Sequence, residues 1–130
     1  MASIFTRIIN REIPGHIVAE NEHAIAFLDV NPLNEGHTLV VPKREVDKLF
    51  DLDKEAYLSL QSFAYEVAQA VEKAMPCLRV GMAVIGLEVP HAHIHLIPLN
   101  SMHDIDFSRP KLKLTQAQFE ETAEKVRGWV

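Results

Sequence analysis

The chain has 130 residues, of which 48% are hydrophobic and 24% charged, a size and composition that predict one globular domain over residues 1–130 with a substantial core. Its net charge of −5 argues against a nucleic-acid polymer or an anionic membrane as partner, because no basic stripe is present to neutralise phosphates. The sequence has no apolar run of signal-peptide or transmembrane length and a single cysteine, Cys77, so a reducing cytoplasm is the expected location.

Turn residues divide the first part of the chain into a short helix and three strands. Residues 4–13 have apolar side chains at spacings that predict a short helix, which ends before Pro14-Gly15. Residues 17–19 and 24–28 are predicted strands joined by a polar turn. A third strand is predicted over residues 37–41, where a near-continuous apolar run indicates burial on both faces.

The second part of the chain contains the longest predicted element. Apolar residues recur at steps of three and four over residues 53–74, which predicts an amphipathic helix of several turns that packs on a sheet. A fourth strand is predicted over 78–85, and a terminal helix over 115–127 begins at Thr115 with capping-box spacing. Short connections between strands favour an antiparallel sheet. We therefore expect an α+β fold, with about five strands, one long helix and a C-terminal helix.

The remaining strand is the most unusual stretch of the sequence. Between Val89 and Leu99, the histidines His91, His93 and His95 alternate with apolar residues. This is the two-residue period of a β-strand, so the three imidazoles should share one face, with successive Cβ atoms about 6.5–7 Å apart. Each buried imidazole needs partners for its nitrogens, which makes three in a row a costly arrangement without a function.

Two kinds of chemistry fit the alternating histidines. In the first, His91, His93 and His95 bind a metal, for which neutral imidazole is a common ligand. Further ligands would come from side chains elsewhere in the sequence: His37, His103, Asp29 or Glu88. In the second, one imidazole attacks phosphorus to form a covalent intermediate, and its neighbours stabilise the negative oxygens. The strand period favours the second interpretation, because attacker and stabilisers share a face.

The sequence resembles the histidine triad (HIT) family over about residues 3–107. The triad itself is His91-Ala92-His93-Ile94-His95-Leu96-Ile97. Four further segments follow the family pattern in the same order: Ile4-Phe5-Thr6-Arg7-Ile8-Ile9, Glu12-Ile13-Pro14, Ala26-Phe27-Leu28-Asp29-Val30-Asn31-Pro32 and Gly36-His37-Thr38-Leu39-Val40-Val41-Pro42-Lys43. The resemblance implies the HIT-like fold and a nucleotide hydrolase.

The resemblance also implies a role for each matching residue. His93 matches the nucleophile, His95 the residue that contacts the α-phosphate, and His91 and His37 the supporting histidines. Asp29 matches the carboxylate that accepts hydrogen bonds from the ribose hydroxyls. The apolar slot for the nucleobase is matched by Phe5, Ile8, Ile13, Phe27 and Val30, although Ile8 and Ile13 could equally be plain core residues. The expected ligand is a purine nucleotide or a nucleotide conjugate.

Family members are homodimers, so the strand over 78–85 and the long helix are expected at an interface. No metal and no other cofactor is expected for catalysis. Many members have cysteines in the first segment that hold a structural zinc, whereas this chain has Ser3 and Thr6 at those positions, so no zinc is predicted.

The turn before the triad departs from the family pattern. Members often have a hydroxyl residue in this turn, which together with backbone amides holds the phosphate, but this chain has Gly86-Leu87-Glu88-Val89. Glu88 and Val89 are therefore expected beside the substrate. Glu88 either acts as a general acid toward a basic leaving group or points to solvent while only backbone amides contact the ligand, and the second alternative is favoured.

The third histidine of the triad indicates which branch of the family the chain resembles. The third position of the triad is a histidine, His95, and the resemblance implies hydrolysis rather than nucleotide transfer for such a chain. A phosphoramidate hydrolase is the preferred interpretation. A dinucleoside polyphosphate hydrolase and a nucleotide-binding sensor or scaffold with little turnover are the alternatives. Trp129 either reaches toward a partner's site in the dimer or packs locally.

Overall fold

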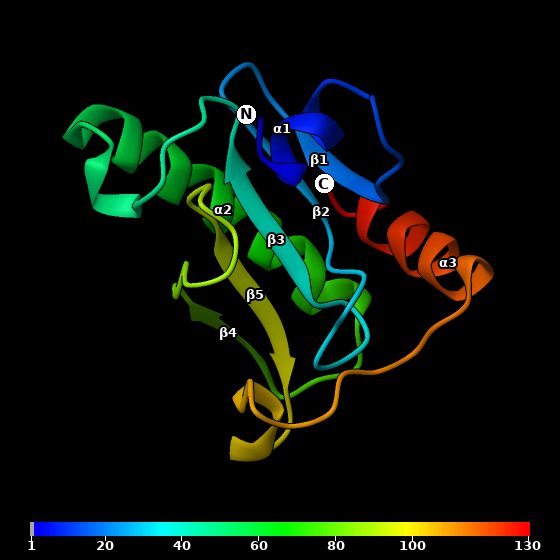
Figure 1. Cartoon of the computed structure of the whole chain (residues 1–130). Coiled ribbons are helices and arrows are strands. Elements are labelled where there is room, and N and C mark those ends of the chain that lie inside the picture. Colours follow the sequence, from blue (N-terminus) through cyan, green and yellow to red (C-terminus); the bar gives the residue numbers. More distant parts are fainter. Residues whose placement is uncertain (1) are drawn as a thin grey trace.

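A computed structural model describes residues 2–130, and its centre is one antiparallel sheet of five strands in the order β1-β2-β3-β5-β4 (Figure 1). The strands are β1 (Ile17–Glu20), β2 (Ala24–Leu28), β3 (Thr38–Pro42), β4 (Arg79–Ala83) and β5 (Ile94–Leu99). The helices are α1 (Ile4–Ile9), α2 (Lys54–Ala74) and α3 (Gln116–Arg127), and short 3-10 turns lie at Leu49–Asp51 and Met102–Ile105. The α+β fold predicted from the sequence is confirmed.

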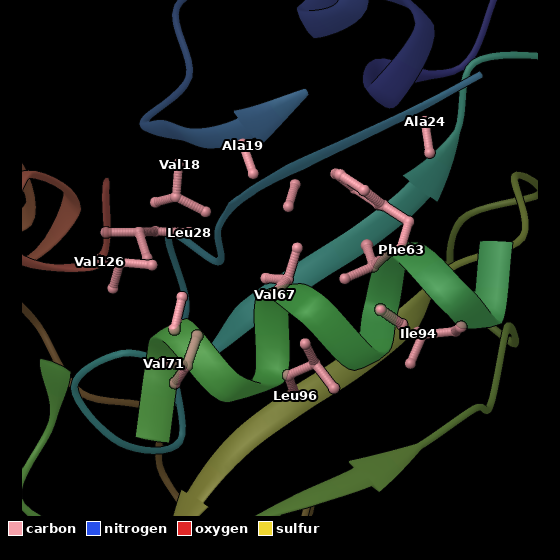
Figure 2. Close-up of a cluster of buried hydrophobic side chains, with 14 of the residues drawn as sticks. Val18, Ala19, Ala24, Leu28, Phe63, Val67, Val71, Ile94, Leu96 and Val126 are labelled. Atoms are coloured by element: carbon pink, nitrogen blue, oxygen red, sulfur yellow. The ribbon is translucent and has the colours of Figure 1, made fainter. Parts of the chain in front are cut away.

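Helix α2 begins and ends where the sequence predicts. The Asp53 side chain caps its first turn by accepting a hydrogen bond from the Ala56 N–H at 2.8 Å. Figure 2 shows Phe63, Val67 and Val71 on the side of α2 that faces the sheet, where Ile94 and Leu96 of β5 meet them. All five side chains are buried, and each contributes about 1.5–3 kcal/mol through the hydrophobic effect. Helix α3 packs beside α2 and against β1, so these two helices cover one face of the sheet (Figure 1).

The opposite face of the sheet packs against α1. Phe5 and Ile8 of α1 form a second, smaller cluster with alternate residues of β2 and β3: Ile25, Phe27, Leu39 and Val41. The strands thus present apolar side chains on both faces, and β2 and β3 are buried along their full length. This confirms the prediction that the third strand is buried on both sides.

Strand β5 is shorter than the histidine stretch. It begins at Ile94, because the backbone amides before it bond outside the sheet ladder: the His91 N–H to the Val89 carbonyl and the Ala92 N–H to the Val46 carbonyl. The alternation nevertheless holds through the whole stretch. Ala92, Ile94 and Leu96 join the core under α2, while His93 and His95 lie on the face of α1.

The loop between β2 and β3 carries two of the predicted site residues, Asp29 and His37, at its two ends. It closes on itself through a 2.9 Å hydrogen bond from the Asp29 N–H to the His37 carbonyl. Gly36 has φ +93°, and a Cβ atom there would lie 2.6 Å from Cγ of Met75. Glycine is therefore required on two grounds: backbone conformation and space.

Within residues 2–130, no helix is both long and apolar enough to cross a bilayer.

Candidate active site

A pocket of about 360 Å³ opens on the α1 face of the sheet, a volume within the usual range for small-molecule sites. Its walls come from α1, the β2–β3 loop, β5 and the turn before the histidines. Ten of the predicted site residues line it: Phe5, Ile8, Phe27, Asp29, Val30, His37, Glu88, Val89, His93 and His95. Two do not. Ile13 packs at the edge of the cluster around Phe27, and His91 is fully buried beneath the pocket.

His93 has one ring nitrogen engaged and one available. Its Nδ1 lies 2.8 Å from the carbonyl oxygen of His91, and because a carbonyl only accepts, Nδ1 must carry the proton. In the neutral ring, Nε2 then holds the lone pair. The ring of Phe5 stands edge-on to the imidazole at 5.0 Å between centroids, which fixes its orientation. The arrangement produces a nitrogen nucleophile in a mostly apolar pocket.

His37 and His95 form a chain with a defined direction. The Leu33 N–H donates to Nδ1 of His37 at 3.0 Å, so His37 carries its proton on Nε2. That N–H donates to Nδ1 of His95 at 2.9 Å, which leaves the His95 proton on Nε2. His95 therefore presents an N–H donor to the pocket.

Burial keeps both of these rings neutral. It lowers the pKa of His37 to about 3, and electrostatic repulsion of a protonated His37 by His95 and Lys111 contributes to a smaller degree. Burial likewise lowers the pKa of His95 to about 4, with His93 as a smaller cause. The donor that the pocket offers at neutral pH is thus an uncharged N–H.

Asp29 directly follows the end of β2 and lines the pocket. One oxygen accepts the Asn31 N–H at 2.8 Å, and the other lies 3.6 Å from Nε2 of His37. Burial raises the pKa of this carboxyl group. The ionised group keeps lone pairs for a ligand, as binding to a vicinal diol requires.

Glu88 and Val89 come from the turn before the histidines. The side chain of Glu88 is exposed at the mouth of the pocket, and Val89 packs partly against the cluster around Phe27. An exposed Glu88 is consistent with the favoured prediction that it points to solvent.

Phe107 and Lys111 are among the residues lining the pocket that were not predicted as site residues from the sequence. The Phe107 ring stands edge-on to His95 at 4.8 Å between centroids. The Lys111 ammonium donates to the backbone carbonyls of Phe107 at 2.6 Å and Arg109 at 3.2 Å, which leaves its third proton for the pocket. They lie in an irregular segment, residues 106–115, whose sequence has no period that would have revealed the contact.

The positions of the ring protons argue against the metal-binding alternative. Among the residues described, ligand atoms of Asp29, His37 and His95 lie within 4.8 Å of one another. The Leu33 amide, however, holds the proton of His37 on Nε2, the nitrogen that would have to bind the ion. His91 has both ring nitrogens engaged, with Ser3 and with the Pro42 carbonyl, so the three triad histidines do not converge on one point.

Comparison with known proteins gives a consistent picture. The HIT domain family model matches residues 10–102. An uncharacterized HIT-like protein of Borreliella burgdorferi is 32% identical over an alignment covering 95% of this chain and 94% of that protein. An adenosine 5'-monophosphoramidase of Saccharomyces cerevisiae is 37% identical over 75% of this chain and 62% of its own length.

Among solved structures, this chain is similar to a Hit-like protein involved in cell-cycle regulation from Bartonella henselae, with unknown ligand. The TM-score is 0.86 and the identity 30%, and the alignment covers 98% of this chain and 96% of that one. The similarity in fold therefore extends beyond the triad to almost the full chain.

Proposed function

The chain belongs to the histidine triad (HIT) family, and on that premise we propose that it hydrolyses a nucleoside phosphoramidate, or a similar nucleotide conjugate, through a nucleotidyl group on His93. The observation that carries the proposal is the pairing of two nitrogens in one pocket: an Nε2 lone pair on His93 and an Nε2–H donor on His95. The ring centroids of the two histidines lie 4.9 Å apart.

The proposed reaction has two steps. The Nε2 lone pair of His93 attacks phosphorus, a P–N bond to the ring forms, and the bond from phosphorus to the leaving amine breaks as that amine gains a proton from solvent. Water then attacks phosphorus and loses a proton to solvent, the bond to Nε2 breaks, and the nucleoside monophosphate leaves. In both steps the His95 N–H donates to a non-bridging oxygen, where negative charge develops.

The rest of the pocket suits a purine nucleotide. In this proposal Phe5, Ile8 and Phe27 form the apolar slot for the base and the Asp29 carboxylate accepts from the ribose hydroxyls, which is supported by their shared position in the pocket lining. The Lys111 ammonium supplies a positive charge that favours an anionic ligand. The name of the yeast relative, an adenosine 5'-monophosphoramidase, supports adenosine phosphoramidate as the first substrate to test.

Glu88 is proposed to have no part in the chemistry. Its side chain is exposed at the pocket mouth, where solvent screens its charge from the phosphate. A general acid would instead be held within hydrogen-bond reach of the leaving nitrogen.

A homodimer is proposed on the basis of an unpaired edge. Strand β4 ends the sheet, and within residues 2–130 its backbone pairs with β5 alone. Apolar side chains around it are exposed to an unusual degree: Leu78 at 77%, Met82 at 47%, Val84 at 42% and Ile85 at 45%. An exposed apolar edge strand favours pairing with another chain.

The test is AMP release from adenosine 5'-phosphoramidate, measured for wild type, His93→Ala and Glu88→Ser. We expect turnover by wild type, loss of at least about 10³-fold in His93→Ala because the nucleophile is absent, and an unchanged rate in Glu88→Ser. A large loss in Glu88→Ser would restore the general-acid role. AMP binding by wild type without turnover would contradict the hydrolase and favour the nucleotide sensor.

A further inference from the structure

A cluster of four polar side chains lies beneath the pocket, where the start of α1 meets the histidine stretch. The cluster consists of Ser3, Thr6, Glu45 and His91. The Ser3 hydroxyl lies 2.7 Å from Nδ1 of His91, and the Glu45 carboxylate accepts from the Ser3 N–H at 2.7 Å and from the Thr6 hydroxyl at 2.6 Å. Ser3 is buried and the His91 side chain is fully buried, so the contact between them forms in a largely dry environment, whereas Glu45 is exposed.

The direction of each hydrogen bond in the cluster follows from its partners. Nε2 of His91 lies 2.8 Å from the Pro42 carbonyl, which can only accept, so His91 carries its proton on Nε2. Nδ1 of the neutral ring must then accept, and the Ser3 hydroxyl is its donor. The Ser3 oxygen in turn accepts the Thr6 N–H at 3.1 Å, which is the cap of α1.

The next link joins His91 to the nucleophile. The carbonyl oxygen of His91 accepts the Nδ1 proton of His93 at 2.8 Å, and this bond leaves the lone pair on Nε2. The same α1 segment carries Phe5, whose ring contacts both imidazoles at 5.8 Å and 5.0 Å between centroids. The position of His93 therefore depends on how His91 and α1 are held together.

We propose that Ser3 is a positioning residue for the nucleophile: its hydroxyl holds His91 in the Nε2–H form, and the His91 carbonyl then holds His93 with Nε2 unprotonated. This inference rests on the proposed role of His93. Glu45 orients Ser3 by binding its backbone N–H, and hydrogen bonds from Ser3 and Thr6 lower the pKa of Glu45 to about 2, so the carboxylate is ionised at all working pH values. Capping of α1 alone would not require a proton donor at Ser3, because a capping side chain only accepts.

The experiment separates the proton donor from the cap. Ser3→Thr keeps both functions, Ser3→Asp keeps the capping acceptor but has no proton to give, and Ser3→Gly lacks the hydroxyl while it remains a tolerated cap. Thr115→Gly is the matched control, because Thr115 caps α3 by the same kind of bond, to the Gln118 N–H, on a different helix from the one that contacts His91 and His93. Long-range ¹H–¹⁵N spectra of the histidine rings report which nitrogen carries the proton, and AMP release gives kcat and KM.

We expect wild type and Ser3→Thr to show His91 protonated on Nε2 alone. In Ser3→Asp, we expect a second proton on Nδ1 of His91, facing the new carboxylate. Ser3→Asp and Ser3→Gly should each lower kcat by at least about tenfold while KM stays within about threefold, because nucleophile geometry is lost and substrate binding is kept. Thr115→Gly should leave kcat and all ring protons unchanged.

Two results would overturn the inference. The first is a wild-type His91 with its proton on Nδ1, which needs no substrate to observe. The second is a folded Ser3→Gly or Ser3→Asp protein with wild-type kcat. Failure of the proposed function would give a different result. Wild type would release no AMP, whereas the ring spectra would still show His91 protonated on Nε2 alone.

Discussion

The histidines in and next to this pocket have defined proton positions. In each chain of hydrogen bonds between their rings, a backbone amide or carbonyl binds one ring nitrogen and so decides which nitrogen carries the proton. The Leu33 amide sets the proton position of His37, and through it that of His95, while the Pro42 carbonyl and the Ser3 hydroxyl together set that of His91. His93 takes its form from the carbonyl of His91. Backbone groups cannot titrate, so they define the same tautomer of each neutral ring whatever the pH.

Acid pH should destabilise the fold through the buried histidines. The pKa values of His37 and His95 are about 3 and about 4 in the folded chain and near 6.5 in an unfolded one, so only the unfolded state takes up protons as the pH falls from about 6.5 to 4. Each of the two rings therefore lowers the free energy of unfolding by about 2 kcal/mol at pH 5.0 compared with pH 7.5. Urea unfolding at the two pH values measures the loss.

The variant His37→Gln tests the assignment. It should reduce the difference between the two pH values by about 2 kcal/mol, because one depressed pKa is removed. The control is His23→Gln, since His23 is an exposed side chain and its removal should leave the difference unchanged. An identical pH dependence in His37→Gln and wild type would show that His37 is not held neutral by burial.

At the scale of the elements, the irregular segment over residues 106–115 contacts the site through tertiary interactions. The Arg109 guanidinium donates to the Leu33 carbonyl at 2.6 Å, and the Leu112 N–H donates to the Pro32 carbonyl at 2.8 Å. The segment is thereby fixed to the β2–β3 loop, which carries Asp29 and His37. It places Phe107 against His95, where the ring excludes water.

Replacement of Phe107 should therefore raise the pKa of His95. Phe107→Ala removes the aromatic wall, water reaches the imidazole, and the pKa of His95 should rise from about 4 toward the usual value near 6.5. An NMR pH titration of the ring protons measures the shift. Phe50→Ala is a suitable control, because Phe50 is 83% exposed and lies outside the pocket. An unchanged His95 pKa in Phe107→Ala would show that other groups keep the ring dry.

For the molecule as a whole, the regular elements were predictable from the sequence and the irregular ones were not. Helix α2 and the strands follow from their apolar periods, and the cap of α3 follows from the spacing of Thr115 and Gln118. The periodicity of the histidine stretch predicted its faces but not the start of β5, which depends on the amide of Ala92 bonding to Val46, a distant residue. No local pattern encodes such contacts.

The candidate site was predictable to a similar degree. The family resemblance supplied all but two of the residues that the argument uses in the pocket, and the structure places ten of them in one cavity. Phe107 and Lys111 were missed because their segment has no secondary structure and reaches the pocket only through tertiary contacts. The hydrogen bond from Ser3 to His91 spans 88 positions, and those from Ser3 and Thr6 to Glu45 span 42 and 39 positions. No local pattern in the sequence reveals any of them.

The proposed dimer can be tested at the edge of the sheet. Met82→Arg places a charge on β4, at a side chain that is 47% exposed in the single chain, and should convert a dimer to a monomer because burying the new charge is costly. Light scattering coupled to size exclusion measures the mass. The control Phe50→Arg adds the same charge at an exposed site away from β4 and should keep the mass of two chains. A wild type with the mass of one chain would contradict the proposed dimer.

The most direct test of the proposed mechanism is intact-protein mass spectrometry after a rapid quench in alkaline denaturant, which preserves P–N bonds, of the protein with excess adenosine 5'-phosphoramidate. Wild type should gain the mass of one adenylyl group per chain, placed on His93 by peptide mapping, while His93→Ala should gain none. Covalent attachment is expected because Nε2 of His93 holds an unshared lone pair in the pocket beside the His95 donor. AMP release by wild type without any adduct at the earliest quench times, or an adduct on another residue, would contradict nucleophilic catalysis by His93.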